Sequence, residues 1–277
     1  MGIFTAPDGT LLAYRAVGSG APLVCLAGGP MRASRYLGDL GGLADRVPLV
    51  LLDHRGTGES AEPADPASYR CDQLVDDVEA LRRELRADRI DLLGHSAGGS
   101  LTVRYAERYP ERVRSLVLAT PSTRAVGVAV TADARRAAME RRSVEPWYAE
   151  GMAAFEAIQR DENSDWEPLI PFYYGRWDDV ARAHHAAEVA ETNHVAAATY
   201  NDDAAFDPPA TRAALASLQA PVLLVGGEFD LVTPPEAAEE FAGLFPNARF
   251  VLQPGTSHFP WLDNPDAFVK TVGDFLA

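Results

Sequence analysis

The chain has 277 residues, 47% of them hydrophobic, which is enough to bury a large core in a globular protein. Its formal net charge of −15, without a basic cluster, would repel phosphates, so we expect no nucleic-acid partner. It has neither an apolar run long enough to span a membrane nor a signal-like start, so we expect a cytoplasmic protein without a membrane partner.

Strand-like apolar runs alternate with helical patterns through the first part of the chain. It begins with a hairpin, in which a turn at Gly9 separates residues 3–5 from residues 11–14. Continuous apolar runs predict buried strands at residues 23–27, 47–53, 90–93 and 113–119. Apolar residues at helical spacing predict helices at residues 72–85 and 100–108. This alternation is typical of a largely parallel sheet covered by helices on both faces.

The pattern changes after Pro121. The following stretch, residues 122–210, has no convincing strand and predicts several helices, the longest over residues 178–200. Strands are then predicted at residues 221–225 and 248–252, and helices at residues 235–244 and 265–276. The sequence therefore predicts one α/β core, residues 1–121 and 211–277, with a helical insertion at residues 122–210.

Residues 94–98 read GHSAG, which fits the G-x-S-x-G pattern of a nucleophile turn. The pattern follows the strand predicted at residues 90–93 and precedes the helix predicted at residues 100–108, as this chemistry requires. Glycines flank the serine because the turn is tight, and the adjacent helix N-terminus favours a developing negative charge. We therefore expect Ser96 to be a nucleophile rather than a serine that only caps a helix.

A serine needs a base to react at neutral pH, and an acid must orient that base. Of the six histidines, only His258 lies on a loop after a late predicted strand, so we expect it to be the base. The strand at residues 221–225 leads into Asp230, the expected acid. Glu228 is the competing acid, and we expect it to have a structural or surface role.

An oxyanion hole needs two backbone N–H donors. One should belong to Ala97, directly after the expected nucleophile. The other should belong to Gly29, in the glycine-rich loop after the strand at residues 23–27, because glycine lets the backbone approach a substrate oxygen closely. The alternative for this loop is a plain tight turn.

Together these features resemble the α/β-hydrolase superfamily over nearly the whole chain, including the order Ser96, Asp230, His258. The resemblance implies the α/β-hydrolase fold, with a mostly parallel central sheet, helices on both faces and residues 122–210 as a helical cap, or lid. It implies a serine hydrolase. Haloalkane dehalogenases and most epoxide hydrolases of this superfamily are excluded, because they use a nucleophilic aspartate where this chain has Ser96. No metal and no organic cofactor are implied.

Two motifs resemble the proline iminopeptidase branch of this superfamily. Residues 28–30 (GGP) resemble its HGGPG loop, and residues 53–60 resemble its D-x-R-G-x-G-x-S segment, which we expect to be a structural turn. The chain departs from that branch at Ala27, where the branch has histidine, and at Met31, where it has glycine. The nucleophile turn also differs, because the branch usually has a GGSWGG-like sequence there.

Aromatic residues are dense in the predicted cap, and small-molecule pockets are mostly apolar and aromatic. The candidate substrate-binding residues are Trp147, Tyr173, Trp177 and Phe259. Cap glutamates bind the free amine of the substrate in the proline iminopeptidase branch, so the resemblance adds Glu188 and Glu191. Acidic residues on a helix are more often simply solvated.

The sequence therefore predicts a serine hydrolase that cleaves an ester or amide bond through an acyl-enzyme. The expected substrate is a small, partly apolar molecule or a short peptide, and aminopeptidase-like activity is one possibility within this class. The alternatives are a carboxylesterase or lactonase, a hydrolase of carbon–carbon bonds with the same triad, and a non-catalytic small-molecule receptor.

Overall fold

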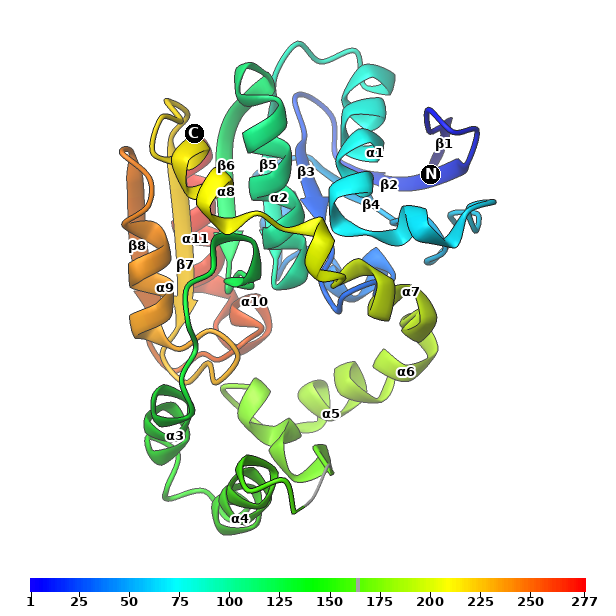
Figure 1. The fold of residues 1–277 in the computed structure, drawn as a ribbon. Helices are drawn as coiled ribbons and strands as arrows, with labels where there is room; N and C mark the ends of the chain where they lie inside the picture. Colours follow the sequence, from blue (N-terminus) through cyan, green and yellow to red (C-terminus); the bar gives the residue numbers. More distant parts are fainter. Residues whose placement is uncertain (163–164) are drawn as a thin grey trace.

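A computed structural model describes residues 1–162 and 165–277, which form one eight-stranded sheet in the order β1-β2-β4-β3-β5-β6-β7-β8 (Figure 1). The strands are β1 Gly2–Thr5, β2 Leu11–Val17, β3 Leu23–Leu26, β4 Leu49–Leu52, β5 Ile90–His95, β6 Val113–Ala119, β7 Val222–Gly227 and β8 Ala248–Gln253. β2 is antiparallel to β1 and β4, and the other pairs are parallel. This confirms the predicted mostly parallel sheet.

Successive residues of the central strands face opposite layers, as the two-residue repeat of a strand requires. On β3, Val24 and Leu26 pack into the core that contains α1, α2 and α9, whereas Leu23 and Cys25 pack toward α11. These helices are α1 Cys71–Glu84, α2 Ala97–Arg108, α9 Pro235–Ala242 and α11 Pro265–Leu276. Burial on both faces explains why the strands read as continuous apolar runs.

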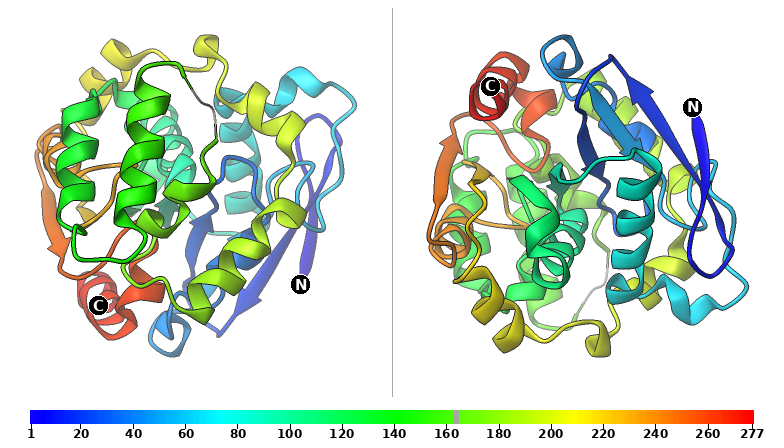
Figure 2. Two further views of the ribbon diagram at one scale, coloured as in Figure 1. Left: turned by 90° about the horizontal axis from the view of Figure 1, so that it is seen from below. Right: turned by 90° about the horizontal axis from the view of Figure 1, so that it is seen from above.

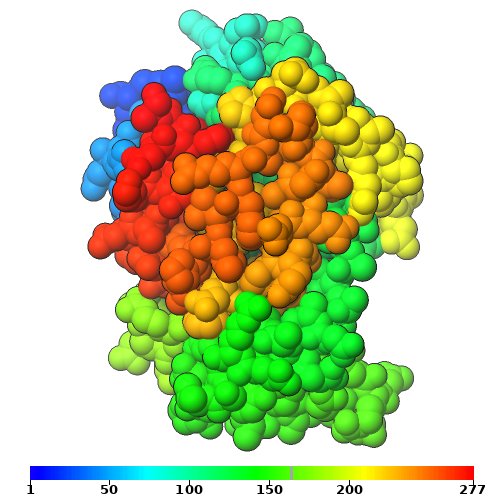
Figure 3. Space-filling view, turned by 90° about the vertical axis from the view of Figure 1, so that its left-hand side faces the viewer, coloured from blue at the N-terminus to red at the C-terminus, as the bar shows by residue number. Residues whose placement is uncertain are grey.

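Further helices lie beyond one end of the sheet, below it in Figure 1. They are α3 Ala132–Glu140, α4 Tyr148–Gln159, α5 Asp179–Ala186, α6 Glu188–Glu191 and α7 His194–Tyr200, and α8 Pro208–Leu215 leads back to the core. From below, several of them lie in front of the strands (Figure 2), and Figure 3 shows the green residues of α3 and α4 at the lower end of the molecule. No helix among the described residues is long and apolar enough to cross a membrane. The division into core and cap domains stays our proposal.

The predicted long helix over residues 178–200 is wrong, because the chain forms three shorter helices there, α5, α6 and α7. Thr192 is extended (φ −103°, ψ 127°) and forms an isolated β-bridge with Arg32 in the loop after β3. Asn193 then caps α7 by accepting a hydrogen bond from the N–H of Ala196 at 3.0 Å. Pairing with a distant loop and a local cap outweigh the helix propensity of the alanine-rich stretch.

Candidate active site

The candidate residues lie in loops at the carboxyl ends of four parallel strands, where α/β sheets commonly bind ligands. Gly29 follows β3, Ser96 follows β5, Asp230 follows β7 and His258 follows β8. Gly29, Ser96 and His258 line one cavity of about 250 Å³. The chain direction of a parallel sheet thus brings residues from four distant segments together.

Ser96 occupies a strained turn between β5 and α2, with φ 52° and ψ −122°. Only glycine fits two residues before it and two residues after it. A Cβ at Gly94 would lie 2.2 Å from Thr102 Oγ1, and a Cβ at Gly98 would lie 2.2 Å from the carbonyl oxygen of Leu26. The turn therefore holds the serine at the cavity, directly before the N-terminus of α2.

His258 and Asp230 form a buried pair, with 3.0 Å between His258 Nδ1 and Asp230 Oδ2. Asp230 has no exposed surface, and its Oδ1 accepts hydrogen bonds from the N–H groups of Val232 and Thr233 at 2.8 and 3.2 Å. Because an ionised carboxylate only accepts, Nδ1 carries the proton in neutral His258 and Nε2 is left as an acceptor. His258 can therefore receive a proton on the side away from Asp230.

The loop after β3 approaches the serine closely. A Cβ at Gly28 would lie 2.8 Å from the Cβ of Ser96, and Gly29 has a φ of +115° that favours glycine. The N–H of Gly28 donates to the Tyr36 hydroxyl at 2.7 Å, whereas within residues 1–162 and 165–277 the N–H of Gly29 has no recorded partner. The N–H of Ala97, in the first turn of α2, likewise has none within this range.

The cavity wall combines rings, aliphatic groups and a few charges. Its lining residues are Gly29, Arg32, Tyr36, His95, Ser96, Ile170, Tyr173, Tyr174, His185, Glu188, Val232, His258 and Phe259. Burial raises the pKa of Tyr173 to about 12, so this residue presents a neutral phenol to the cavity.

The structure does not place Trp147 or Trp177 in this wall. The Trp147 ring packs edge-on against Phe172, with centroids 4.6 Å apart. The Trp177 ring packs against Tyr174, with centroids 5.4 Å apart. Packing against neighbouring aromatic rings accounts for both tryptophans, whereas Tyr173 and Phe259 do line the cavity.

The two cap glutamates lie in different surroundings. The Glu188 side chain lines the cavity and is 40% exposed, with 3.8 Å between its Oε2 and Arg32 Nη1. The Glu191 side chain does not line the cavity. It accepts a hydrogen bond from Arg32 Nε at 2.8 Å, and its other oxygen lies 3.4 Å from Arg35 Nε. Glu191 therefore connects α6 to the loop after β3, and of these two glutamates only Glu188 lines the cavity.

The D-x-R-G-x-G-x-S segment has the structural contacts that we expected. Asp53 accepts hydrogen bonds from the backbone and hydroxyl of Ser34 at 2.8 and 2.7 Å. Arg55 is buried and pairs with Asp77 at 2.5 Å. Neither Asp53 nor Arg55 lines the cavity, so the segment braces the core beneath the site.

The lining residues that the sequence did not predict include Arg32, Tyr36 and His95. His95 belongs to the nucleophile turn itself, and Arg32 lies two residues after Pro30 of the glycine-rich loop. Their proximity to these motifs was the available signal. Tyr36 had none, since its position depends on how the loop after β3 folds back.

Comparison with known proteins supports the fold and the resemblance. Residues 21–265 match the alpha/beta hydrolase fold family. The proline iminopeptidase of Heyndrickxia coagulans is 25% identical over 275 residues, covering 94% of this chain and 91% of that protein. The solved structure of proline iminopeptidase from Mycobacterium smegmatis has a TM-score of 0.75 and 23% identity, covering 99% of this chain and 97% of that chain.

An esterase from Exiguobacterium antarcticum, EaEST, has a similar structure, with a TM-score of 0.74 and 21% identity, covering 99% of this chain and 98% of that chain. At this identity the likeness shows the fold alone. The family match spans most of the chain and agrees with the sheet order and the serine turn after β5. The protein is therefore a hydrolase of the α/β-hydrolase family, similar in sequence to proline iminopeptidases.

Proposed function

We propose that this protein is a serine hydrolase that cleaves an ester or amide bond of a small, partly apolar substrate through an acyl-enzyme. One observation carries the proposal: Ser96 and His258 line the same cavity, and His258 Nδ1 lies 3.0 Å from the buried carboxylate of Asp230. A serine, a base and an orienting acid are the groups that acyl transfer requires.

In this mechanism the Ser96 oxygen attacks the substrate carbonyl carbon while His258 Nε2 takes the hydroxyl proton. The negative oxygen that forms would accept hydrogen bonds from the N–H groups of Gly29 and Ala97. His258 then protonates the leaving alcohol or amine, which yields the acyl-enzyme. Water attacks this ester with His258 as base, and the acid product leaves Ser96 free. Throughout, Asp230 holds the imidazole tautomer and stabilises its protonated form.

The volume and the lining of the cavity favour a small substrate. Its volume of about 250 Å³ is below the usual range for drug-sized ligands. Ile170, Val232 and Phe259 offer apolar contacts, and Arg32 and Glu188 are the charged groups in the wall. This combination suits a small acyl or amine portion with one polar group.

Two classes of substrate follow from the charged groups. The Glu188 carboxylate could pair with a free ammonium group of the substrate. Together with the similarity to proline iminopeptidases, this favours an aminopeptidase. Arg32, 3.8 Å from Glu188, partly offsets that carboxylate and favours an uncharged ester, as for a carboxylesterase or lactonase. A carbon–carbon bond hydrolase and a non-catalytic receptor are the remaining alternatives.

A paired assay on the purified protein tests the proposal. Hydrolysis of p-nitrophenyl esters is compared with hydrolysis of prolyl and alanyl p-nitroanilides, with free or acetylated amines. Ser96→Ala should lower kcat by several orders of magnitude without unfolding the chain. Retained hydrolysis in that variant would sink the proposal.

The same assay separates the substrate classes. Anilide cleavage that needs a free amine, and that Glu188→Gln weakens, identifies an aminopeptidase. Ester cleavage alone identifies a carboxylesterase-type enzyme. Labelling of Ser96 by a fluorophosphonate, without turnover of either substrate, favours a hydrolase of carbon–carbon bonds. Absence of both labelling and turnover favours the receptor.

A further inference from the structure

Two buried side chains connect the three loops of the candidate site. The N–H of Gly28 lies 2.7 Å from the hydroxyl of Tyr36, and that hydroxyl lies 2.6 Å from His95 Nδ1. His95 Nε2 in turn lies 2.9 Å from the backbone carbonyl oxygen of His258. The chain of bonds therefore runs from the oxyanion loop, past the residue before Ser96, to the backbone of the base.

The two ends of this chain fix which group donates in each hydrogen bond. The N–H of Gly28 can only donate, and the carbonyl of His258 can only accept. His95 must therefore donate from Nε2 and accept at Nδ1, and Tyr36 must donate its hydroxyl proton to Nδ1. Burial, followed by the neighbouring His258, lowers the pKa of His95 well below its ordinary value, which keeps Nδ1 an acceptor.

Packing holds the two side chains in place. The His95 ring lies edge-on to Trp261, with centroids 4.8 Å apart, and the Arg32 guanidinium lies 4.5 Å from the centre of the Tyr36 ring. The His258 carbonyl is held from a second side, because the Thr120 hydroxyl donates to it at 2.9 Å. A small shift of any member would leave a buried polar group unpaired, which is unfavourable.

We propose that Tyr36 and His95 are positioning residues, which set the oxyanion loop and the base relative to Ser96. The inference rests on the proposed serine-hydrolase function. Tyr36 anchors the loop at Gly28, directly before the expected donor Gly29, and His95 anchors the backbone of His258. Because both anchors meet in one hydrogen bond, loss of either side chain should misplace both groups.

Two variants break the hydrogen bond between Tyr36 and His95, one from each side. Tyr36→Phe removes only the hydroxyl, whereas His95→Gln keeps a donor for the His258 carbonyl but not the ring acceptor for Tyr36. For each, kcat should fall roughly 10- to 100-fold with KM nearly unchanged, because errors of about an ångström in a reacting geometry cost this much. The rate of fluorophosphonate labelling should fall in parallel, since labelling needs the same geometry without depending on the chosen substrate.

Non-additivity gives a second readout. If the two residues act through one chain of bonds, the double variant should lose little more activity than the more affected single variant. Tyr105→Phe is the matched control, because its hydroxyl is also buried but donates to Glu79 at 3.0 Å, away from the site. It should lower the melting temperature without lowering kcat.

Ser96→Ala separates the two proposals. If Ser96→Ala is inactive, but Tyr36→Phe and His95→Gln keep the kcat and labelling rate of Tyr105→Phe, the positioning role is overturned and the proposed function stands. If Ser96→Ala retains activity, both proposals fail. If one variant does not fold, the other still decides, since each breaks the same chain of bonds.

Discussion

At the scale of single residues, Asp230 is the most constrained group of the site, because it is fully buried and both of its oxygens accept hydrogen bonds. In Asp230→Asn the side-chain amide can donate to His258 Nδ1, which would stabilise the wrong tautomer and leave Nε2 protonated. We expect kcat to fall by roughly 10³- to 10⁴-fold with the fold retained. Steady-state kinetics and circular dichroism check this expectation.

Glu228→Gln is the control for that experiment. Glu228 Oε2 accepts from the N–H of Gly255 at 2.8 Å, so it braces the loop that leads to His258 and has no recorded bond to the imidazole. The control should keep kcat within a few fold of the parent. A larger loss in Glu228→Gln than in Asp230→Asn would assign the acid to the other residue.

How far the candidate site could be predicted depends on the kind of signal. Ser96, Asp230 and His258 were predicted because each follows a strand, and the carboxyl ends of parallel strands converge. Tyr36 carries no such signal, since its place in the wall depends on how the loop after β3 folds back, and Arg32 has only its proximity to the glycine-rich loop. For the same reason the sequence could not show that Glu191 pairs with Arg32.

At the scale of elements, continuous apolar runs predicted the central strands β3, β4, β5, β6 and β7, because burial on both faces leaves a strong local pattern. The helical part was predicted less well. No local pattern shows that Thr192 pairs with Arg32 or that Asn193 donates to the carbonyl of Gly56 at 2.9 Å. These bonds to distant loops break the helix predicted over residues 178–200.

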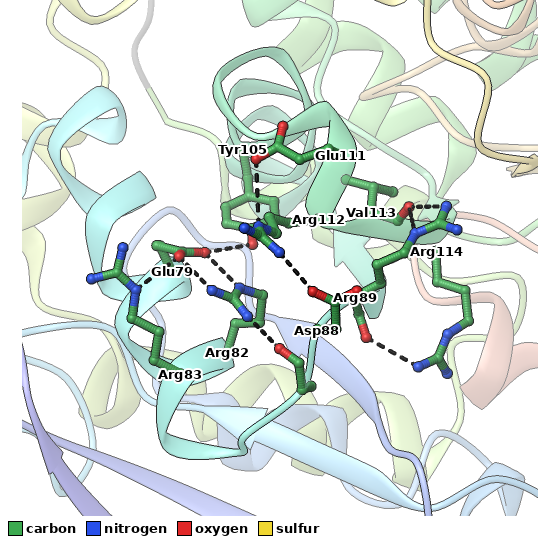
Figure 4. Close-up of polar contacts among 11 residues, drawn as sticks. Glu79, Arg82, Arg83, Asp88, Arg89, Tyr105, Glu111, Arg112, Val113 and Arg114 are labelled. Carbon is green, nitrogen blue, oxygen red and sulfur yellow. Dashed lines mark hydrogen bonds and ion pairs between the residues drawn. The ribbon is translucent and has the colours of Figure 1, made fainter.

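Helix α1 carries a buried carboxylate that should make stability depend on pH. Figure 4 shows Glu79 facing Arg82, Arg83 and Tyr105, which all donate to it. Burial alone would raise the pKa of Glu79, but these hydrogen bonds outweigh burial and lower it to about 2. Ionised Glu79 therefore stabilises the folded chain above its ordinary pKa of 4.5, and this contribution is lost as pH falls toward 2.

Glu79→Gln should lower the free energy of unfolding at neutral pH by roughly 2 kcal/mol, and by less near about pH 3. Denaturant unfolding at a series of pH values measures the difference. Glu111→Gln is the control, because Glu111 is exposed and pairs only loosely with Arg112 at 3.4 Å. A loss for Glu79→Gln that does not shrink toward low pH would refute the electrostatic explanation.

At the scale of the whole molecule, the proposed cap is fixed to the loop that carries the base. The Ser257 hydroxyl donates to the carbonyl of Phe172 at 2.6 Å, and the N–H of His258 donates to the carbonyl of Tyr173 at 3.0 Å. The same cap segment supplies Tyr173 and Tyr174 to the cavity wall. The position of the base and the shape of the cavity are therefore coupled.

Asp263, at the end of α10 (Pro260–Asp263), joins the same two parts. Burial raises its pKa to about 6, although hydrogen bonds from three backbone N–H groups act in the opposite direction. Those groups belong to Ser257, beside the base, and to Gly175 and Arg176 of the cap segment. The carboxylate thus bridges the proposed cap and the proposed core, at a cost in stability when it is ionised.

The sign of this cost gives a testable pH dependence. The folded chain holds the Asp263 proton more tightly than the unfolded chain, whose ordinary value is 3.8, so this group's contribution to stability falls as pH rises from about 4 through about 6. Asp263→Asn lacks this titration. The free energy of unfolding of the parent, minus that of the variant, should therefore fall by roughly 2 kcal/mol between about pH 4 and pH 7.

Urea unfolding of the parent and of Asp263→Asn across this range measures that difference, and taking the difference cancels the other carboxyl groups. Asp266→Asn, which removes an exposed charge from the start of α11, controls for the change in net charge. A difference that stays constant or rises with pH would contradict the prediction.

Asp263 holds the backbone of Ser257, next to the base. The kcat of Asp263→Asn, measured alongside, therefore shows whether the hydrogen bonds of Asp263 also position His258.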